Sequence, residues 1–177
     1  MTGPARDFTI RKAARADLET CRTIERAASH SFAGTRHAHL VGSEPDTIAE
    51  LEPALASGTI WLAEDDRGAA LGFLKALVIA EGLHIDELDV LPAAQSRGIG
   101  RALVFHAEAH ANARTLPALW LRTFRDVPWN APFYARLGFE IAPDGEPASM
   151  APTFAAHERE SGLDPVDRCT MVKRLLR

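Results

Sequence analysis

The chain has 177 residues, which suffices for one compact domain spanning residues 1–177 and is short for two. Its composition, 46% hydrophobic and 25% charged, is that of a folded globular protein and excludes a disordered chain. The net charge of -4 at pH 7 excludes a general electrostatic attraction to nucleic acid or to an anionic membrane, so we expect neither as a partner.

The sequence shows neither a targeting signal nor a metal-binding cysteine pattern. Residues 1–15 contain no apolar stretch of signal-peptide length, and no apolar run approaches the ~20 residues of a membrane span. We therefore expect a cytoplasmic protein. Cys21 and Cys169 lie far apart without metal-ligand spacing, which predicts two reduced, structural thiols.

The N-terminal part of the chain is predicted to form a strand and two helices. Residues Thr9–Ala13 alternate in polarity like a strand. Asp17 then precedes apolar residues at helical spacing, namely Leu18, Cys21, Ile24 and Ala28. A second short helix is expected from about Pro45, whose fixed φ suits a first turn, until Pro53 or Gly58 ends it.

The next segment is predicted to be a meander of three strands. Thr59–Glu64 and Ala70–Ile79 are strand-like, and the polar loop Asp65–Gly68 between them suits an antiparallel hairpin. Leu83–Leu91 is the third strand, and Pro92 ends it because proline cannot donate to the ladder.

The order then changes to helix and strand in alternation. We expect a helix over Gly98–Ala111, a strand over Leu119–Phe124 and a short helix over Asn130–Leu137. Such a crossover requires the strands at Leu83–Leu91 and Leu119–Phe124 to run parallel. With final strands at Phe139–Ile141 and Arg168–Arg174, the predicted fold class is α+β with a mixed, mostly antiparallel sheet.

The loop before the predicted Gly98 helix has the features of an anion-binding site. It reads Gln95-Ser96-Arg97-Gly98-Ile99-Gly100, and it would present free N–H groups at a helix N-terminus. Arg97 and Arg101 add positive charge. A tight turn without a ligand is the alternative. A Rossmann loop is disfavoured because Leu103 replaces a small residue, and the Gly-Lys-Ser/Thr of a P-loop is absent.

The arrangement Gln95-x-x-Gly98-x-Gly100, following Asp86–Val90, resembles the Gln/Arg-x-x-Gly-x-Gly/Ala pattern of the GNAT acetyltransferase family. The resemblance implies a six- or seven-stranded sheet whose central parallel strands splay around the acyl-CoA arm. It implies that residues 95–101 hold the coenzyme A pyrophosphate, with Ser96, Ile99 and Arg101 included. The main chain of Leu88, Asp89 and Val90 would contact the pantetheine and the thioester.

The resemblance continues through Leu119–Phe124 and through Asn130-x-x-Phe133-Tyr134-x-x-Leu137-Gly138-Phe139. It implies that Asn130 and Phe133 contact the cofactor. It also implies that Tyr134, the only tyrosine, protonates the departing thiolate. Without the resemblance, core packing would be the simpler interpretation of this tyrosine.

Acetyl transfer to nitrogen also needs a group that accepts a proton from the amine, whose pKa is about 10. Strand alternation places His84 and Asp86 on one face and Glu87 on the other, unless a bulge intervenes. By resemblance Glu87 is our first candidate for the base and His84 our second. A solvated or substrate-binding acid is an equally good interpretation. Glu25, Asp86 and Thr123 are candidates for the acceptor site, and the acids favour a cationic acceptor.

Two histidine pairs have a spacing that metal ligands could have, but neither is expected to bind a metal. These are His37 with His39 and His106 with His110, and neither has a third ligand signal nearby. We expect solvated histidines and no metal.

The predicted function is transfer of an acetyl group from acetyl-CoA to a primary amine of a small cationic molecule, by direct attack in a ternary complex. One alternative is a non-catalytic acyl-CoA sensor, and another is an acyltransferase that uses a bulkier acyl-CoA. A homodimer is possible on general grounds.

Overall fold

A computed structural model describes residues 7–143, 145–150 and 163–175. The chain forms two compact units. Unit 1 contains the described residues up to Leu77 together with Glu87–Ala107, and unit 2 contains Val78–Asp86 and the described residues from Glu108 onward.

The described residues contain a seven-stranded mixed sheet with the strand order β1-β2-β3-β4-β5-β7-β6. The strands are β1 (Phe8–Lys12), β2 (Ile60–Asp65), β3 (Ala70–Ile79), β4 (Gly82–Val90), β5 (Ala118–Phe124), β6 (Glu140–Ile141) and β7 (Arg168–Arg174). The α-helices are α1 (Leu18–Ala28), α2 (Ile48–Ser57), α3 (Ile99–Ala113) and α4 (Ala131–Ala135). The predicted α+β class is confirmed. Of the six or seven strands expected, the sheet in the described residues has seven.

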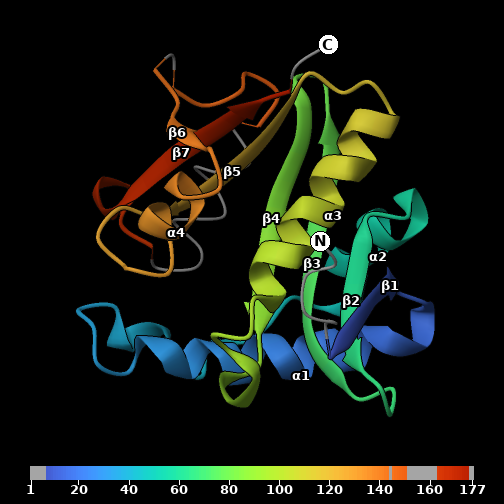
Figure 1. The fold of residues 1–177 in the computed structure, drawn as a ribbon. Coiled ribbons are helices and arrows are strands. Elements are labelled where there is room, and N and C mark those ends of the chain that lie inside the picture. Colours follow the sequence, from blue (N-terminus) through green and yellow to red (C-terminus); the bar gives the residue numbers. More distant parts are fainter. Residues whose placement is uncertain (1–6, 144, 151–162, 176–177) are drawn as a thin grey trace, which may run out of the picture. The chain divides into compact units, whose positions relative to one another are not determined.

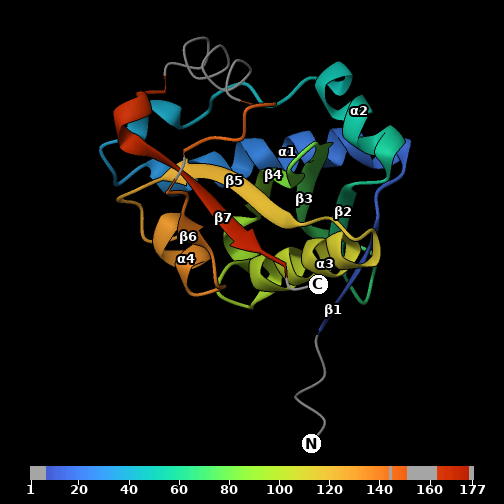
Figure 2. The same ribbon diagram turned by 90° about the horizontal axis from the view of Figure 1, so that it is seen from above.

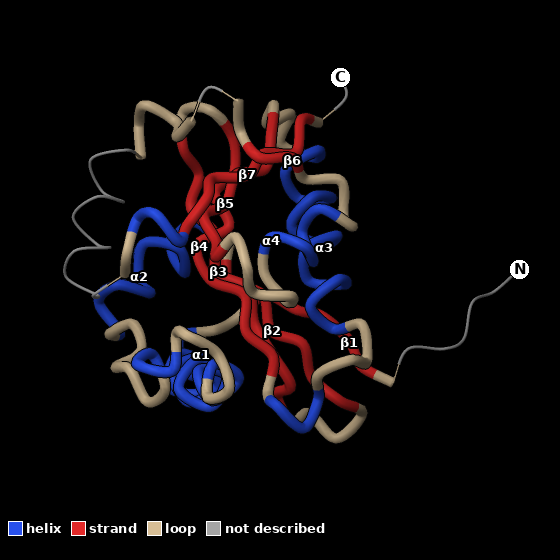
Figure 3. Tube along the Cα trace, turned by 90° about the vertical axis from the view of Figure 1, so that its left-hand side faces the viewer, coloured by secondary structure: helices blue, strands red, loops and turns tan. Residues whose placement is uncertain are grey.

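Unit 1 is built on the antiparallel strands β1, β2 and β3, which run side by side in Figure 1. In Figures 2 and 3, α1 and α2 cover one face of these strands and α3 covers the other. Residues of α1, α2, β2 and β3 form one buried apolar cluster on the first of these faces. Its members are Leu18, Cys21, Ile24, Leu51, Ala54, Ile60, Leu62 and Phe73. The helical spacing of the first three therefore reports the buried side of α1, as predicted.

The opposite face of β2 packs on the part of α3 that belongs to unit 1. Trp61 is fully buried, and its ring centroid lies 5.6 Å from that of His106 in an edge-on arrangement. Burial and the nearby charge of Lys12 lower the pKa of His106. His106 therefore belongs to a helix–sheet contact.

Helix α2 begins three residues later than Pro45, so the predicted start is wrong. Thr47 caps it instead, accepting a hydrogen bond from the Glu50 amide while the Glu50 carboxylate accepts one from the Thr47 amide. This reciprocal pair is a capping box. The helix ends at Gly58, whose φ of 67° is left-handed.

Unit 2 contains the start of β4 and the strands β5, β6 and β7. The start of β4 pairs in parallel with β5, at Leu83 with Leu119, His84 with Trp120 and Ile85 with Leu121. The predicted parallel pair is thus confirmed. Strand β7 is antiparallel to both β5 and β6 and lies between them, which the chain order did not predict.

The parallel pair begins with a close approach of two backbones. Gly82 has a φ of 144°, and a Cβ atom added to it would lie 2.1 Å from the carbonyl oxygen of Ala118. Only glycine fits at this position without a shift of the backbone.

Candidate active site

The loop that leads into α3 has the geometry of an anion-binding site. Ser96 and Gly98 both have left-handed backbone conformations, with φ of 62° and 81°. The first helical bond follows at once, from the Ala102 amide to the Gly98 carbonyl oxygen at 3.0 Å. The amides of the first turn have no acceptor inside a helix, so they are available to an anion in front of it. A Cβ atom at Gly98 would meet nothing within 4 Å, so the space there is open.

Gln95 ties this loop to other parts of unit 1. Its side-chain amide donates to the hydroxyl of Ser31 at 3.0 Å and to the carbonyl oxygen of Val90 at 3.3 Å. Its amide nitrogen is thus used within the protein. The side chain of Gln95 fixes the position of the loop, and the residues that follow it, Ser96, Arg97 and Gly98, are exposed.

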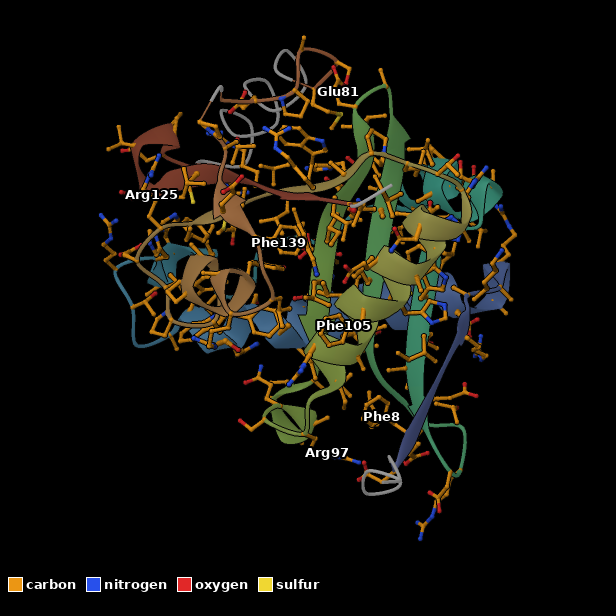
Figure 4. The ribbon with its side chains drawn as sticks, turned by 45° about the horizontal axis from the view of Figure 1, so that its top comes forward. Phe8, Glu81, Arg97, Phe105, Arg125 and Phe139 are labelled. Carbon is orange, nitrogen blue, oxygen red and sulfur yellow. The ribbon has the colours of Figure 1, made fainter. Side chains whose placement is uncertain are left out.

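The two arginines of the loop differ in their surroundings. Arg97 forms an ion pair with Asp7, next to the start of β1 and near the labelled Phe8 in Figure 4. Arg101 is exposed, and its guanidinium lies 5.1 Å from the ring centroid of Phe105 on the same helix. Both partly exposed cations can reorient toward a phosphate.

Within unit 1 the end of β4 lies tightly against β3. A Cβ atom at Gly72 would lie 2.6 Å from the carbonyl oxygen of Asp89, and the amide of Leu91 donates to the carbonyl oxygen of Leu71 at 2.9 Å. These contacts fix the main chain of residues 88–90, the segment expected to contact the pantetheine. Leu88, Asp89 and Val90 are themselves half-buried.

Glu25 on α1 is anchored by the segment before α2. Its two carboxylate oxygens accept the backbone amide of Asp46 at 3.1 and 3.2 Å. The Asp46 carboxylate forms an ion pair with Lys75 of β3, a side chain that is 6% exposed. The Arg22 guanidinium donates to the Asp46 carbonyl oxygen at 2.8 Å and holds the same segment.

Glu25, Glu87 and Asp89 act on one another electrostatically within unit 1. Burial, with the charges of Glu87 and Asp46, raises the pKa of Glu25 to about 8. Burial, the charges of Glu87 and Glu25 and a side-chain hydrogen bond with Glu87 raise the pKa of Asp89 well above its ordinary value. The structure therefore brings together three predicted site residues, Glu25, Glu87 and Asp89.

Sequence reasoning missed two members of this cluster, Asp46 and Lys75. Lys75 carried a usable signal, because it interrupts an otherwise apolar strand over Leu71–Leu77. A lysine in such a run is either exposed or paired, and strand alternation alone does not name the partner. Asp46 lies in an irregular segment. Such a segment has no helical or strand periodicity from which the position of a side chain could be predicted.

In unit 2, His84 and Asp86 lie on one face of β4, as alternation predicts. Nδ1 of His84 is 3.8 Å from Oδ1 of Asp86, and His84 is buried. The parallel register places His84 beside Trp120, whose indole N–H donates to the Glu81 carbonyl oxygen at 3.0 Å. A buried imidazole beside a carboxylate is a sound arrangement for proton transfer.

Tyr134 is a buried residue of α4, with 7% of its surface exposed. Its ring centroid is 5.1 Å from that of Phe133 and 5.6 Å from that of Phe139, the latter labelled in Figure 4. These edge-on contacts fix the orientation of the ring. The structure thus places the predicted residues Phe133 and Tyr134 together.

Asn130 precedes α4, and its main chain and its side chain differ in their hydrogen bonding. Its carbonyl oxygen accepts the amides of Phe133 at 2.8 Å and Tyr134 at 3.1 Å. Its side-chain Nδ2 is buried and donates to no acceptor among the described residues. A buried amide donor of this kind is available to a ligand atom.

Thr123 lies in β5 opposite Cys169 of β7, and both residues are buried. Its neighbour Phe124 is also buried and stacks with Arg168, whose guanidinium lies 5.0 Å from the ring centroid. Burial raises the pKa of the Cys169 thiol and also that of Cys21, the latter to about 12. Both cysteines are free and buried, consistent with structural thiols.

The described residues contain neither a candidate metal cluster nor a helix that could span a membrane. Over residues 7–143, 145–150 and 163–175, no group of three or more His, Cys, Asp or Glu side chains is arranged to hold a metal ion. In the same ranges, every helix is too short or too polar to cross a membrane.

Comparisons with known proteins agree with the fold. The chain superimposes on N-acetylglutamate synthase from Neisseria gonorrhoeae, solved with coenzyme A and N-acetyl-glutamate, with a TM-score of 0.72 and 21% identity over 96% of this chain. It spans only 35% of the length of that protein. The PaiA N-acetyltransferase from Thermoplasma acidophilum, solved with coenzyme A, gives a TM-score of 0.67 and 17% identity, covering 95% of this chain and 99% of its own.

A third solved structure has a different kind of acceptor in its name. The ribosomal-protein-S18-alanine N-acetyltransferase from Escherichia coli gives a TM-score of 0.65 and 19% identity, covering 96% of this chain and 95% of its own. At these identities the likeness shows the fold alone. The sequence itself matches the model of the acetyltransferase (GNAT) family over residues 20–139. With this match, the sheet and the loop before α3, the chain belongs to the GNAT acetyltransferase family.

Proposed function

We propose that this chain transfers an acetyl group from acetyl-CoA to a primary amine of a small cationic molecule, by direct attack in a ternary complex. The observation that carries the proposal is the loop before α3, where Ser96 and Gly98 are left-handed and a Cβ atom added at Gly98 would meet nothing within 4 Å. In the GNAT family this loop serves coenzyme A, and two of the similar structures were solved with that molecule.

The pyrophosphate would be held by the main chain of residues 95–101. Ser96, Gly98, Ile99 and Gly100 supply amides, and Arg97 and Arg101 supply charge. Arg97 forms an ion pair with Asp7, and in this role it would exchange Asp7 for a phosphate. Gln95 acts through its bonds to Ser31 and Val90, which hold the loop in place.

The acyl arm would lie along residues 88–90. The main chain of Leu88 and Val90 bonds the pantetheine, and an amide near Asp89 polarises the thioester carbonyl, the largest electrostatic contribution expected in acyl transfer. Asn130 and Phe133 of unit 2 are further cofactor residues. The buried, unused Nδ2 of Asn130 supports its part as a donor to the cofactor.

The reaction needs three proton movements. The acceptor ammonium loses a proton to a base, and its nitrogen then attacks the thioester carbonyl, so that a C–N bond forms. The C–S bond breaks, its electron pair leaves with sulfur, and an acid protonates the thiolate. The nitrogen loses its second proton as the amide forms, and this proton restores the acid. The sum is an amine cation and acetyl-CoA giving an amide, coenzyme A and one proton.

Tyr134 is the proposed acid and Glu87 the proposed base, with His84 as the second candidate. The aromatic contacts of Tyr134 with Phe133 and Phe139 would fix its hydroxyl for proton donation. The 3.8 Å approach of Asp86 to His84 supports the second candidate base.

The acceptor is proposed to be cationic because Glu25 and the candidate base Glu87 belong to one acidic cluster of unit 1. Glu25 is a member of the acidic cluster of unit 1, and Asp86 is an exposed acid of β4. Thr123 is a further candidate contact, although its burial restricts it to a contact within a closed pocket. The similar structures carry different acceptors in their names, so the fold leaves the acceptor open.

Calorimetry with coenzyme A, followed by a free-thiol assay with acetyl-CoA and a panel of amines, tests the proposal. The panel should contain amino acids, polyamines, aminoglycosides and peptide N-termini. Coenzyme A binding with thiol release on a cationic amine is expected. Binding without release on any amine would favour an acyl-CoA sensor, and stronger competition by succinyl-CoA than by acetyl-CoA would favour a bulkier acyl group.

The assembly and location of the protein are also proposals. We propose a homodimer, because symmetric dimers are the commonest oligomers of soluble proteins, and a cytoplasmic site of action. Light scattering after size exclusion measures the former, and microscopy of a tagged chain measures the latter.

A further inference from the structure

Glu87 and Asp89 form a carboxyl pair on one face of β4. They are two residues apart, so their side chains point the same way from the strand. A side-chain hydrogen bond joins them. The Oδ2 atom of Asp89 is buried and has no hydrogen-bond partner among the described residues. Two carboxyl groups can share a hydrogen bond only when one of them holds a proton.

The charges that face this pair favour retention of that proton. Glu25 of α1 and Asp46 of the segment before α2 act on Asp89 electrostatically. Lys75 of β3 acts on Glu25. Lys75 forms an ion pair with Asp46. The cluster therefore contains four carboxyl groups and a single ammonium group. Four partly buried carboxylates near one cation are not all ionised at neutral pH.

The buried Oδ2 atom of Asp89, which has no hydrogen-bond partner among the described residues, assigns the proton to this member of the pair. Burial is the largest contribution to its raised pKa, and the charges of Glu87, Glu25 and Asp46 act in the same direction. The hydrogen bond to Glu87 also favours the protonated form of Asp89. A protonated Asp89 donates, and Glu87 then accepts as a carboxylate.

We propose that Asp89 is a positioning residue of the reaction proposed above: its protonated carboxyl group donates a hydrogen bond to Glu87 and holds that carboxylate in place as proton acceptor. The inference rests on the proposed function, in which Glu87 is the base. Glu87 takes the proton of the acceptor ammonium on its carboxylate, and the proton of Asp89 stays within the pair. Release of the first proton to water restores the starting state.

Infrared spectroscopy tests the protonation state without any substrate. The full-length protein is titrated from pH 5 to pH 9, with and without ¹³C-labelled aspartate. An isotope-shifted carboxylic acid band that persists at pH 7 in the wild type and is absent in Asp89→Asn is expected. The Glu25→Gln variant removes the separate glutamic acid signal. Absence of a protonated aspartic acid band at pH 7 would overturn the inference, whatever the activity of the enzyme.

Kinetics test the positioning role. Asp89→Asn keeps a neutral donor of similar shape, and Asp89→Leu removes the donor. We expect kcat to fall at least about tenfold in the leucine variant and at most about threefold in the asparagine variant, with coenzyme A affinity unchanged in both. The asparagine variant should also lose the alkaline decline in kcat that ionisation of Asp89 produces in the wild type.

Glu44→Gln serves as the surface control, since Glu44 is an exposed acid paired with Arg26 at 3.3 Å. Thermal unfolding identifies any variant that fails to fold. Equal kcat values and pH profiles for wild type and both Asp89 variants would refute the positioning role and leave the proposed function standing. Failure of the wild type to release thiol with any amine would instead refute the function, and the infrared result would still decide the state of Asp89.

Discussion

The two carboxylate oxygens of Glu25 accept the backbone amide of Asp46, at 3.1 and 3.2 Å. This relationship joins α1 to the segment that precedes α2, 21 residues further along the chain. The Asp46 amide and the charge of Lys75 stabilise the Glu25 carboxylate, whereas burial and the charges of Glu87 and Asp46 disfavour it. The second influence is stronger, so Glu25 binds its proton more tightly than a solvated glutamate does.

The first prediction is that protonation of Glu25 makes the stability of the fold depend on pH. Its pKa rises from 4.5 to about 8 on folding, so the folded state binds more protons between these values. The free energy of unfolding should therefore fall as the pH rises from 4.5 to about 8, by up to about 1 kcal/mol per pH unit. Urea unfolding at pH 5, 6, 7 and 8 measures the slope.

The Glu25→Gln variant should show a shallower slope over this range, because the amide does not titrate. Asp89 contributes a slope of the same sign, so a residual dependence is expected. Glu44→Gln should follow the wild type within about 0.5 kcal/mol at each pH. Parallel slopes for wild type and Glu25→Gln would contradict the assignment.

Tyr134→Phe should lower turnover at least about tenfold and leave coenzyme A affinity unchanged, since it removes only the proposed proton donor. The ring contacts with Phe133 and Phe139 survive in the variant, so the melting temperature should stay close to that of the wild type. Steady-state thiol release and calorimetry are the two measurements. Turnover equal to the wild type would remove Tyr134 from the chemistry.

Gly98→Asp should weaken coenzyme A binding at least about tenfold, because a carboxylate would enter the open space where a phosphate is proposed to lie. Gly68→Asp is the matched control in the hairpin of unit 1. Both glycines are left-handed, with φ of 81° and 79°, and both have no atom within 4 Å of an added Cβ. Calorimetry should therefore separate the two variants, and equal affinities would refute the loop as the cofactor site.

Gly82→Ala should destabilise the fold by more than about 2 kcal/mol or prevent folding, because its Cβ would collide with the Ala118 backbone. Gly145→Ala is the control in the same unit, with a φ of 79° and open space around the added atom. Strain alone should cost the control about 1 kcal/mol. Chemical denaturation compares them, and similar losses would show that the close approach relaxes easily.

Much of the fold was predictable because its signals are local or topological. The apolar spacing of Leu18, Cys21 and Ile24 identified α1, and the helix between two strands required β4 and β5 to be parallel. The start of α2 was predicted wrongly. Its signal was the Thr47 and Glu50 capping box, which defines the first turn better than Pro45 does.

Other features depend on long-range contacts that no local pattern encodes. The position of β7 between β5 and β6 is one, since a strand near the C-terminus can join the sheet at several places. The ion pair of Lys75 with Asp46 is another, because its members lie 29 residues apart on a strand and an irregular segment. Sequence reasoning therefore proposed Glu25 and Glu87 singly and missed the cluster that links them.

The hydrogen bond from Gln95 to Ser31 joins positions 64 residues apart, and it links the loop before α3 to the short helix Ser29–Phe32 after α1. A ligand that orders the loop would also suppress local opening of that helix. Amide hydrogen exchange at residues 29–32 would then report occupancy of the loop from outside it. In a Gln95→Ala variant, which lacks this hydrogen bond, hydrogen exchange at residues 29–32 should no longer respond to occupancy of the loop.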